Sequence, residues 1–90
     1  MRKDNLFEIG KNYFIRTVTH HYTGKLVSVG EKELVLTQAA WIADDGRFAQ
    51  AVASGEFNEV EPYPAEARVI IGRGALLDAV VIPKLPVTQK

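Results

Sequence analysis

Arg73 is the side chain of this sequence best suited to holding an anion, because it stands between Gly72 and Gly74. A guanidinium group is a planar fork of donors that matches the geometry of phosphate and carboxylate. Glycine accepts a positive φ or a close backbone approach, so the Gly-Xaa-Gly pattern predicts a special backbone position. Two plainer roles for Arg73 stay open, an exposed turn arginine and an inter-subunit ion pair.

His20 and His21 are the only histidines, and they are adjacent on a predicted strand. Successive side chains of a strand point to opposite faces, so the two do not easily chelate one metal ion. The sequence has no cysteine and no further histidine that would complete a metal site. We therefore predict no metal site, and we expect His20 to contact a ligand with Arg16, which we place on the same face.

Tyr22 is a further candidate for a ligand contact, because aromatic rings on small β domains stack on nucleic-acid bases. Arg16 and Lys25 are near it in the sequence. Aromatic rings also form the core of small β domains, and both roles stay open for Tyr13, Phe14, Tyr22 and Trp41. For Trp41, the single tryptophan, we expect a packing anchor.

The motifs of common catalytic sites are missing from the sequence. Ser28 and Ser54 stand in no recognised nucleophile context. The stretch Gly72–Gly74 lacks the third glycine and the following helix of a dinucleotide fingerprint. The run Asp44–Gly46 lacks the later ligands of a calcium loop, so we interpret it as a helix cap. We therefore predict a non-enzymatic protein without a cofactor.

Composition predicts one small globular domain over residues 1–90. Apolar residues make up 47% of a 90-residue chain, a size at which one core is marginal and oligomerisation often helps. Eleven basic and eleven acidic side chains cancel, so overall charge indicates no nucleic-acid or membrane partner. The sequence has no cysteine, no signal peptide and no apolar run of roughly 18 residues, which predicts a cytoplasmic protein.

Closely spaced turn residues predict that the first half of the chain is a β-meander. We expect three strands there, which are Tyr13–Tyr22, broken by Thr23-Gly24, then Leu26–Val29 and Glu33–Thr37. A short helix over Leu6–Ile9 is expected before them, capped by Asp4 or Asn5 and closed by Gly10.

An insertion over about residues 40–66 is expected to follow the third strand. The segment Gln38–Ile42 has no clear period. Asp44-Asp45 is expected to cap a helix over Gly46–Ser54, with Gly55 at its C-terminal stop. The acidic stretch Glu56–Glu66 contains two prolines and is predicted to be an exposed, extended linker, pinned by Phe57 and Tyr63.

Two apolar runs, Val69–Ile71 and Ala75–Ile82, predict two buried strands joined by a sharp bend. The second run is almost unbroken, whereas a strand with one solvated face alternates. A 90-residue chain can hardly bury both faces of its last strand, so we expect a partner subunit. The tail Lys84–Lys90 is expected to fray or to contact a neighbour.

Two segments of the chain resemble the Sm/Lsm/Hfq family of small SH3-like β-barrels, and together they cover about half of it. Within Gly10–Ala39, the run from Gly24 follows the glycine, hydrophobic pair, turn and Leu-Xaa-Leu ending of the first Sm motif. The segment Ile70–Pro83, with its Arg-Gly before an apolar strand, resembles the second motif. The family has an RNA-binding asparagine where this chain has Glu33, and a carboxylate is a poor RNA contact.

The resemblance implies a mainly β, five-stranded, strongly bent barrel with a short N-terminal helix. Strands four and five of neighbouring subunits would pair and close a homo-oligomeric ring. The ring would bind RNA or, more in keeping with the neutral charge, a small nucleotide at its face or between subunits. The site residues would be Arg73 on the phosphate, with Gly72, Gly74, Arg16, His20 and Tyr22.

Two other functions stay open. One is a structural or adaptor ring of a larger assembly, for example a phage-like particle, with no small ligand. The other is an enzyme subunit whose chemistry lies on a partner chain.

Overall fold

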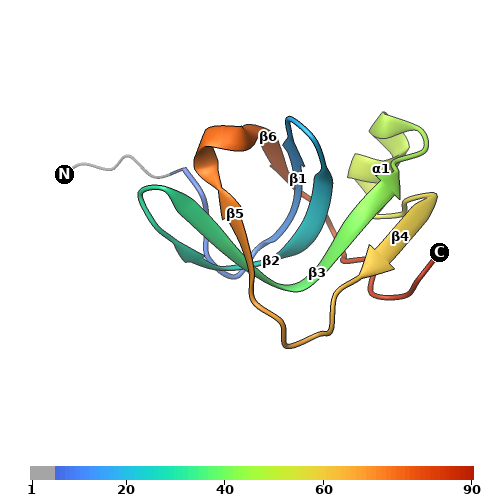
Figure 1. Cartoon of the computed structure of the whole chain (residues 1–90). Helices are drawn as coiled ribbons and strands as arrows, with labels where there is room; N and C mark the ends of the chain where they lie inside the picture. The colour runs from blue at the N-terminus through green and yellow to red at the C-terminus, as the bar shows by residue number, and fades with distance from the viewer. Residues whose placement is uncertain (1–5) are drawn as a thin grey trace.

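The computed structural model describes residues 6–90 and shows one open, bent, antiparallel sheet of six strands with one α-helix (Figure 1). The strands run in the order β4-β3-β2-β1-β6, and β5 pairs with β3. In chain order the elements are β1 (Asn12–Thr17), β2 (His21–Val29), β3 (Glu33–Asp44), α1 (Phe48–Ser54), β4 (Glu59–Pro62), β5 (Val69–Gly72), the 3₁₀ turn η1 (Arg73–Ala75) and β6 (Leu76–Val81).

The mainly β architecture is confirmed, but the prediction of five strands is wrong. The sixth strand is β4, which lies within the stretch predicted to be an exposed linker. The two prolines of this stretch are signals against a strand, so β4 was not predicted from the sequence. Proline is tolerated at an edge strand because its missing N–H need not pair there, and Pro62 is the last residue of β4.

The predicted strand Tyr13–Tyr22 is in fact most of β1 and the first two residues of β2, joined by a tight turn. The Thr17 hydroxyl accepts a hydrogen bond from the His20 amide at 3.0 Å, and the Thr17 amide donates to the His20 carbonyl at 2.8 Å. A side chain that bonds to nearby backbone stabilises a turn in this way. Strand β2 then continues through Gly24, which was predicted to break it.

Strand β3 bends at Gln38 and does not end at Thr37 as predicted. Gln38 has a φ of 51°, and one residue of β2, Gly24, faces two residues of β3 at this point. Such a bulge bends a strand without ending it. A Cβ on Gly24 would lie 2.8 Å from the Leu36 Cβ, so glycine is required where the two strands approach.

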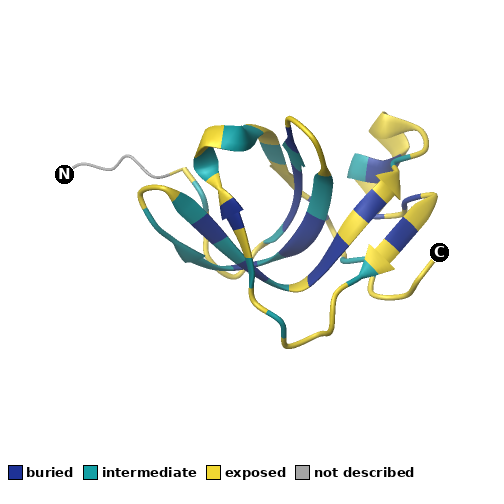
Figure 2. Cartoon of the chain, in the orientation of Figure 1, coloured by how far each residue is buried: buried dark blue, intermediate teal, exposed yellow. Residues whose placement is uncertain are grey.

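The sheet carries a core on each face. Alternation along β1 sends Tyr13 and Ile15 to one core and Phe14 to the other. The first core contains Tyr13, Ile15, Leu26, Leu34, Leu36, Ala39 and Ile71. The second core contains Phe14, Ala40, Ile42, Ala51, Phe57, Val60 and Ile82. Figure 2 shows buried and exposed positions alternating along the second half of β3 and along β4.

Helix α1 confirms the predicted helix and its C-terminal end. Gly55 adopts the left-handed conformation with φ of 77°, and its amide donates to the Ala51 carbonyl at 2.8 Å. The predicted N-terminal cap is wrong. Arg47 stands at the cap position without a side-chain hydrogen bond, and Asp44 instead accepts a hydrogen bond from the Gly46 amide at 2.9 Å.

The predicted helix over Leu6–Ile9 is wrong, because the amides of this segment bond elsewhere. The Glu8 amide donates to the Tyr13 hydroxyl at 2.9 Å, and the Gly10 amide donates to the Leu26 carbonyl at 2.8 Å. Residues 6–8 have no regular secondary structure and residues 9–10 form a turn. The predicted caps Asp4 and Asn5 lie outside the described residues.

The C-terminal tail packs on its own chain. Lys90 and Val60 exchange two backbone hydrogen bonds of 3.0 Å, so the tail covers the outer edge of β4. Ile82 is buried in the second core and Leu85 packs against it. Figure 1 shows α1, β4 and this tail together on one side of the molecule, with β5 and η1 on the other.

The last two strands lie where they were predicted, but the two glycines between them are ordinary. Gly72 has a φ of −70°, and neither Gly72 nor Gly74 has a positive φ or any atom within 4 Å of an added Cβ. The predicted special backbone position is therefore wrong within this chain. No helix among residues 6–90 is long and apolar enough to span a bilayer.

Candidate functional site

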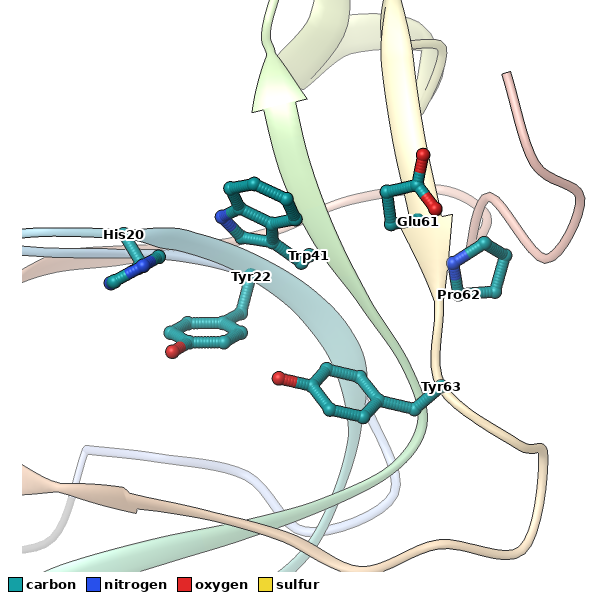
Figure 3. Close-up of a pocket in the computed structure, with 6 residues that line it drawn as sticks. All are labelled: His20, Tyr22, Trp41, Glu61, Pro62 and Tyr63. Carbon is teal, nitrogen blue, oxygen red and sulfur yellow. The ribbon is translucent and has the colours of Figure 1, made fainter.

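An open pocket of about 360 Å³ lies on β2, β3 and the end of β4, and aromatic rings form most of its wall (Figure 3). We call it the aromatic pocket. Its lining residues are His20, Tyr22, Trp41, Glu61, Pro62 and Tyr63.

The register of the sheet builds this pocket. Tyr22 pairs with Trp41, and Trp41 pairs with Glu61, so the three side chains form one row across β2, β3 and β4. Side chains of paired residues stand on the same face of an antiparallel sheet. His20 is two residues before Tyr22 and Tyr63 is two residues after Glu61, and this spacing brings both to the same face.

The rings of the pocket pack on one another and are partly exposed to solvent. The His20 ring centroid lies 6.1 Å from that of Tyr22 and 5.9 Å from that of Trp41. Trp41 is 38% exposed and Tyr63 is 37% exposed, high values for large aromatic side chains. In Figure 3 the Tyr63 hydroxyl points toward the Tyr22 side chain below the Trp41 ring, and the Tyr22 hydroxyl points away from Tyr63.

The charge of the pocket comes from a carboxylate. Of the described residues that line it, none is Lys or Arg, and Glu61 is the one acidic side chain. The Gln89 amide donates a long hydrogen bond of 3.3 Å to Glu61, which leaves acceptor capacity on an exposed carboxylate. Burial, and to a smaller degree the Tyr63 hydroxyl, raise the pKa of Tyr22, so its phenol stays neutral.

Arg73 lies at η1 and does not line the aromatic pocket. Its Nη1 donates to the Gly30 carbonyl at 2.7 Å, and its backbone amide donates to the Lys32 carbonyl at 2.8 Å. The guanidinium carbon also lies 5.5 Å from the centre of the Phe7 ring. These contacts fasten η1 to the turn between β2 and β3, and they use part of the donor fork that a phosphate would need. Gly72 and Gly74 flank this anchor at the surface.

Arg16 also has a partner within the chain. Its Nε and Nη2 donate to the two carboxylate oxygens of Asp78 on β6, the first at 2.9 Å. The hydrogen bond raises the pKa of Arg16 and lowers the pKa of Asp78. The Arg16 guanidinium lies 4.6 Å from the centre of the Phe48 ring, so it faces α1.

The two histidines do point apart, as predicted, but Arg16 accompanies the other one. Arg16 pairs with His21 across β1 and β2, whereas His20 lies in the turn and packs on Tyr22. His21 Nδ1 lies 3.0 Å from an Asp45 carboxylate oxygen. Within the described part of the chain, no group of three or more His, Cys, Asp or Glu side chains is placed to hold a metal ion.

The structure thus joins two of the six predicted site residues, His20 and Tyr22, with Trp41, for which a ligand contact stayed open beside the expected packing role. It adds two residues that the sequence did not suggest, Glu61 and Tyr63, which were placed in a linker. The signal for Glu61 and Tyr63 was the period-two spacing from Val60 to Tyr63, in which these two are exposed whereas Val60 is buried and Pro62 is half-buried. It was hidden because β4 has only four residues.

The outer edges of β5 and β6 form a second candidate site, one for another chain. Within residues 6–90, β5 pairs with β3 and β6 pairs with β1, and the opposite edge of each has no strand beside it. Five of the six residues of β6 are apolar and none is buried. Ile70 on β5 is 67% exposed, and Leu77 on β6 is 62% exposed.

No protein-family model matches the chain, and comparisons with curated proteins and with solved structures also find no match.

Proposed function

We propose that this protein is a non-catalytic module that assembles with copies of itself, by pairing β5 of one copy with β6 of the next. The observation that carries this proposal is β6, a strand of apolar residues that the single chain leaves unburied. Unpaired N–H and C=O groups along a strand edge are a template for another strand. Apolar side chains on both edges add the hydrophobic contribution that stabilises such a pairing.

The pairing is head to tail, because β5 and β6 are different surfaces of the same chain. Heterologous contacts of this kind generate closed rings when the rotation between copies closes. We propose a ring of the Sm-like kind, in which each subunit is a small SH3-like barrel. Support comes from the order of the last elements, where β5 pairs with β3, η1 follows, and β6 returns to β1. Gly72 and Gly74, unneeded within one chain, would then allow a neighbour to approach closely.

Binding of RNA or a small nucleotide by the ring stays a prediction. Arg73 and Arg16, the cations assigned to phosphate, both have partners within the chain. A structural or adaptor ring uses the same assembly and needs neither arginine for a ligand. Self-assembly is common to both, and for this reason we place it first.

Native mass spectrometry of the purified chain tests the assembly. We expect a closed oligomer for the unmodified protein and monomers for Ile70→Lys and for Leu77→Lys. Val87→Lys is the matched control, since Val87 is 63% exposed on the tail, away from both edges. A monomer at every concentration of the unmodified chain would refute the proposal, and so would an oligomer that survives both edge substitutions.

A further inference from the structure

The aromatic pocket is built from residues of one chain and lies on β2, β3 and β4, away from the edges proposed for assembly. We infer that it binds an organic cation, a quaternary ammonium group held against the faces of Trp41, Tyr22 and Tyr63. Binding of this ligand does not depend on assembly of the chain into an oligomeric ring.

Ring electronics favour such a ligand. The faces of Trp and Tyr carry negative potential and attract a cation placed within about 6 Å of the ring centre, with Trp the most effective. The pocket presents the Trp41 ring from β3, the Tyr22 ring from β2 and the Tyr63 ring from the residue that follows β4. Its volume of about 360 Å³ lies in the range of small-molecule sites.

The charge of this pocket favours a cation over a nucleotide as its ligand. Glu61 lines the pocket and no Lys or Arg among the described residues does so, hence a phosphate would meet a carboxylate without a counter-charge. Glu59 is exposed two residues earlier on the same strand and does not line the pocket, so Glu61 is the carboxylate that a ligand meets. A cation gains from both the rings and the carboxylate.

Desolvation favours a quaternary group over a primary amine. An ammonium ion is strongly hydrated and loses that hydration when it enters an aromatic site. A trimethylammonium group spreads its charge over methyl groups that also contact the rings. Aromatic cages for choline and methyl-lysine use this chemistry.

Trp41 is the only tryptophan of the chain, so its fluorescence reports on the pocket directly. The chain is titrated with choline, with its neutral isostere 3,3-dimethylbutanol and with adenosine monophosphate. We expect choline to change the fluorescence in the millimolar range and the neutral isostere to bind about tenfold more weakly. A peptide that carries trimethyllysine forms a second arm, and tighter binding of the peptide than of choline identifies a protein source for the same group.

Three variants locate the binding. Tyr63→Ala should weaken choline binding by about fivefold to thirtyfold. Glu61→Gln should weaken it by about twofold to fivefold, with the loss removed at high salt. Glu59→Gln is the matched control and should have the affinity of the unmodified chain, because Glu59 does not line the pocket.

Three results would overturn the inference. Equal binding of choline and its neutral isostere would show that the pocket binds apolar groups without a contribution from positive charge. Tighter binding of adenosine monophosphate than of choline would make the rings a base-stacking site. No fluorescence change with any probe, while thermal melting shows a folded chain, would leave no ligand site. None of these results bears on assembly, which native mass spectrometry measures separately.

Discussion

Strand β3 serves two different surroundings on either side of its bend at Gln38. The first half pairs with β5 and sends Leu34 and Leu36 into the first core. The second half pairs with β4 and sends Ala40 and Ile42 into the second core. The two halves differ in what lies beyond the neighbouring strand. The outer edge of β4 is covered by the tail, and the outer edge of β5 faces solvent in the single chain.

This difference shows how the chain manages its sheet edges. The chain covers one side of the sheet with its helix and its C-terminal tail. On the other side it leaves apolar side chains exposed to solvent. An exposed apolar edge strand is an association site unless something covers it. The contrast therefore favours a second copy as the cover for β5 and β6, since the chain covers β4 by itself.

The largest effect is expected from breaking the covered side at Phe57. Its side chain is 1% exposed and its ring centroid lies 5.0 Å from that of Phe14, so Phe57→Ala leaves a cavity in the second core. We expect a loss of about 3–5 kcal/mol in the free energy of unfolding. Denaturant unfolding in an Ile70→Lys background measures folding apart from assembly.

Phe48→Ala is the control for this prediction. Phe48 lies on α1 and is 45% exposed, so its truncation should cost less than about 1 kcal/mol. Similar losses for the two variants would show that the second core is not the anchor of the covered side.

Mixing two edge variants sharpens the comparison on the open side. Ile70→Lys spoils β5 and Leu77→Lys spoils β6, each at a cost of about 2–4 kcal/mol per interface. In a head-to-tail assembly the mixture retains one intact β5–β6 interface, so we expect a heterodimer and no ring. Native mass spectrometry distinguishes the two variants when one is isotope-labelled.

An isologous dimer gives a different pattern. If β6 paired with β6, Ile70→Lys alone would remain a dimer and mixing would add nothing. That outcome would retain association through an open edge but reject the ring.

A third prediction concerns the bend that separates the two halves. Gly24→Ala places a Cβ 2.8 Å from the Leu36 Cβ and 3.3 Å from the Ala39 Cβ, so the strands must move apart. We expect a loss of about 1–3 kcal/mol. Gly74→Ala is the control, because its Cβ meets nothing within 4 Å, and it should change the free energy of folding by less than about 0.5 kcal/mol. Thermal or denaturant unfolding of both variants in the Ile70→Lys background checks the contrast.

The same two glycines show how far the sequence could predict the fold. A glycine pattern indicates that a backbone is unusual, but it does not say which glycine has close neighbours. Gly24 looked like the end of a strand, and only the pairing of β2 with the bulge in β3 shows why it is needed. The pattern around Gly72 looked more specific and has no such contact within the chain.

The candidate site was less predictable than the strands for a related reason. A run of apolar residues is a local property, and two such runs placed β5 and β6 within a residue or two. The aromatic pocket depends on register between strands far apart in sequence, such as Trp41 opposite Glu61. Strand β4 has four residues and ends in proline. Its register with β3 depends on the packing of Phe57 and Val60 in the second core, and no short-range sequence pattern reveals that packing.

The smallest effects are expected from the ion pairs that tie each side together. On the covered side, hydrogen bonding and the charge of Lys84, then the charge of Lys90, lower the pKa of Glu56. On the open side, the hydrogen bond from Arg16 lowers the pKa of Asp78. A carboxyl group whose pKa is lower in the folded chain stabilises it above the unfolded pKa and loses that contribution as pH falls through the folded value.

Glu56→Gln and Asp78→Asn should therefore each lower stability slightly at neutral pH and have no effect in strong acid. The window follows from the ordinary pKa values of 4.5 for Glu56 and 3.8 for Asp78, so the difference from the unmodified chain should begin to shrink below about those values. Both pairs are largely exposed, so salt should reduce the neutral-pH differences as well.

Glu31→Gln is the control, since Glu31 forms no ion pair with the described residues, and its difference should not vary with pH in this way. Denaturant unfolding at neutral and acid pH in the Ile70→Lys background makes the comparison. A difference for Asp78→Asn that grows in acid would mean that the Arg16 pair strains the β1–β6 contact and does not support it.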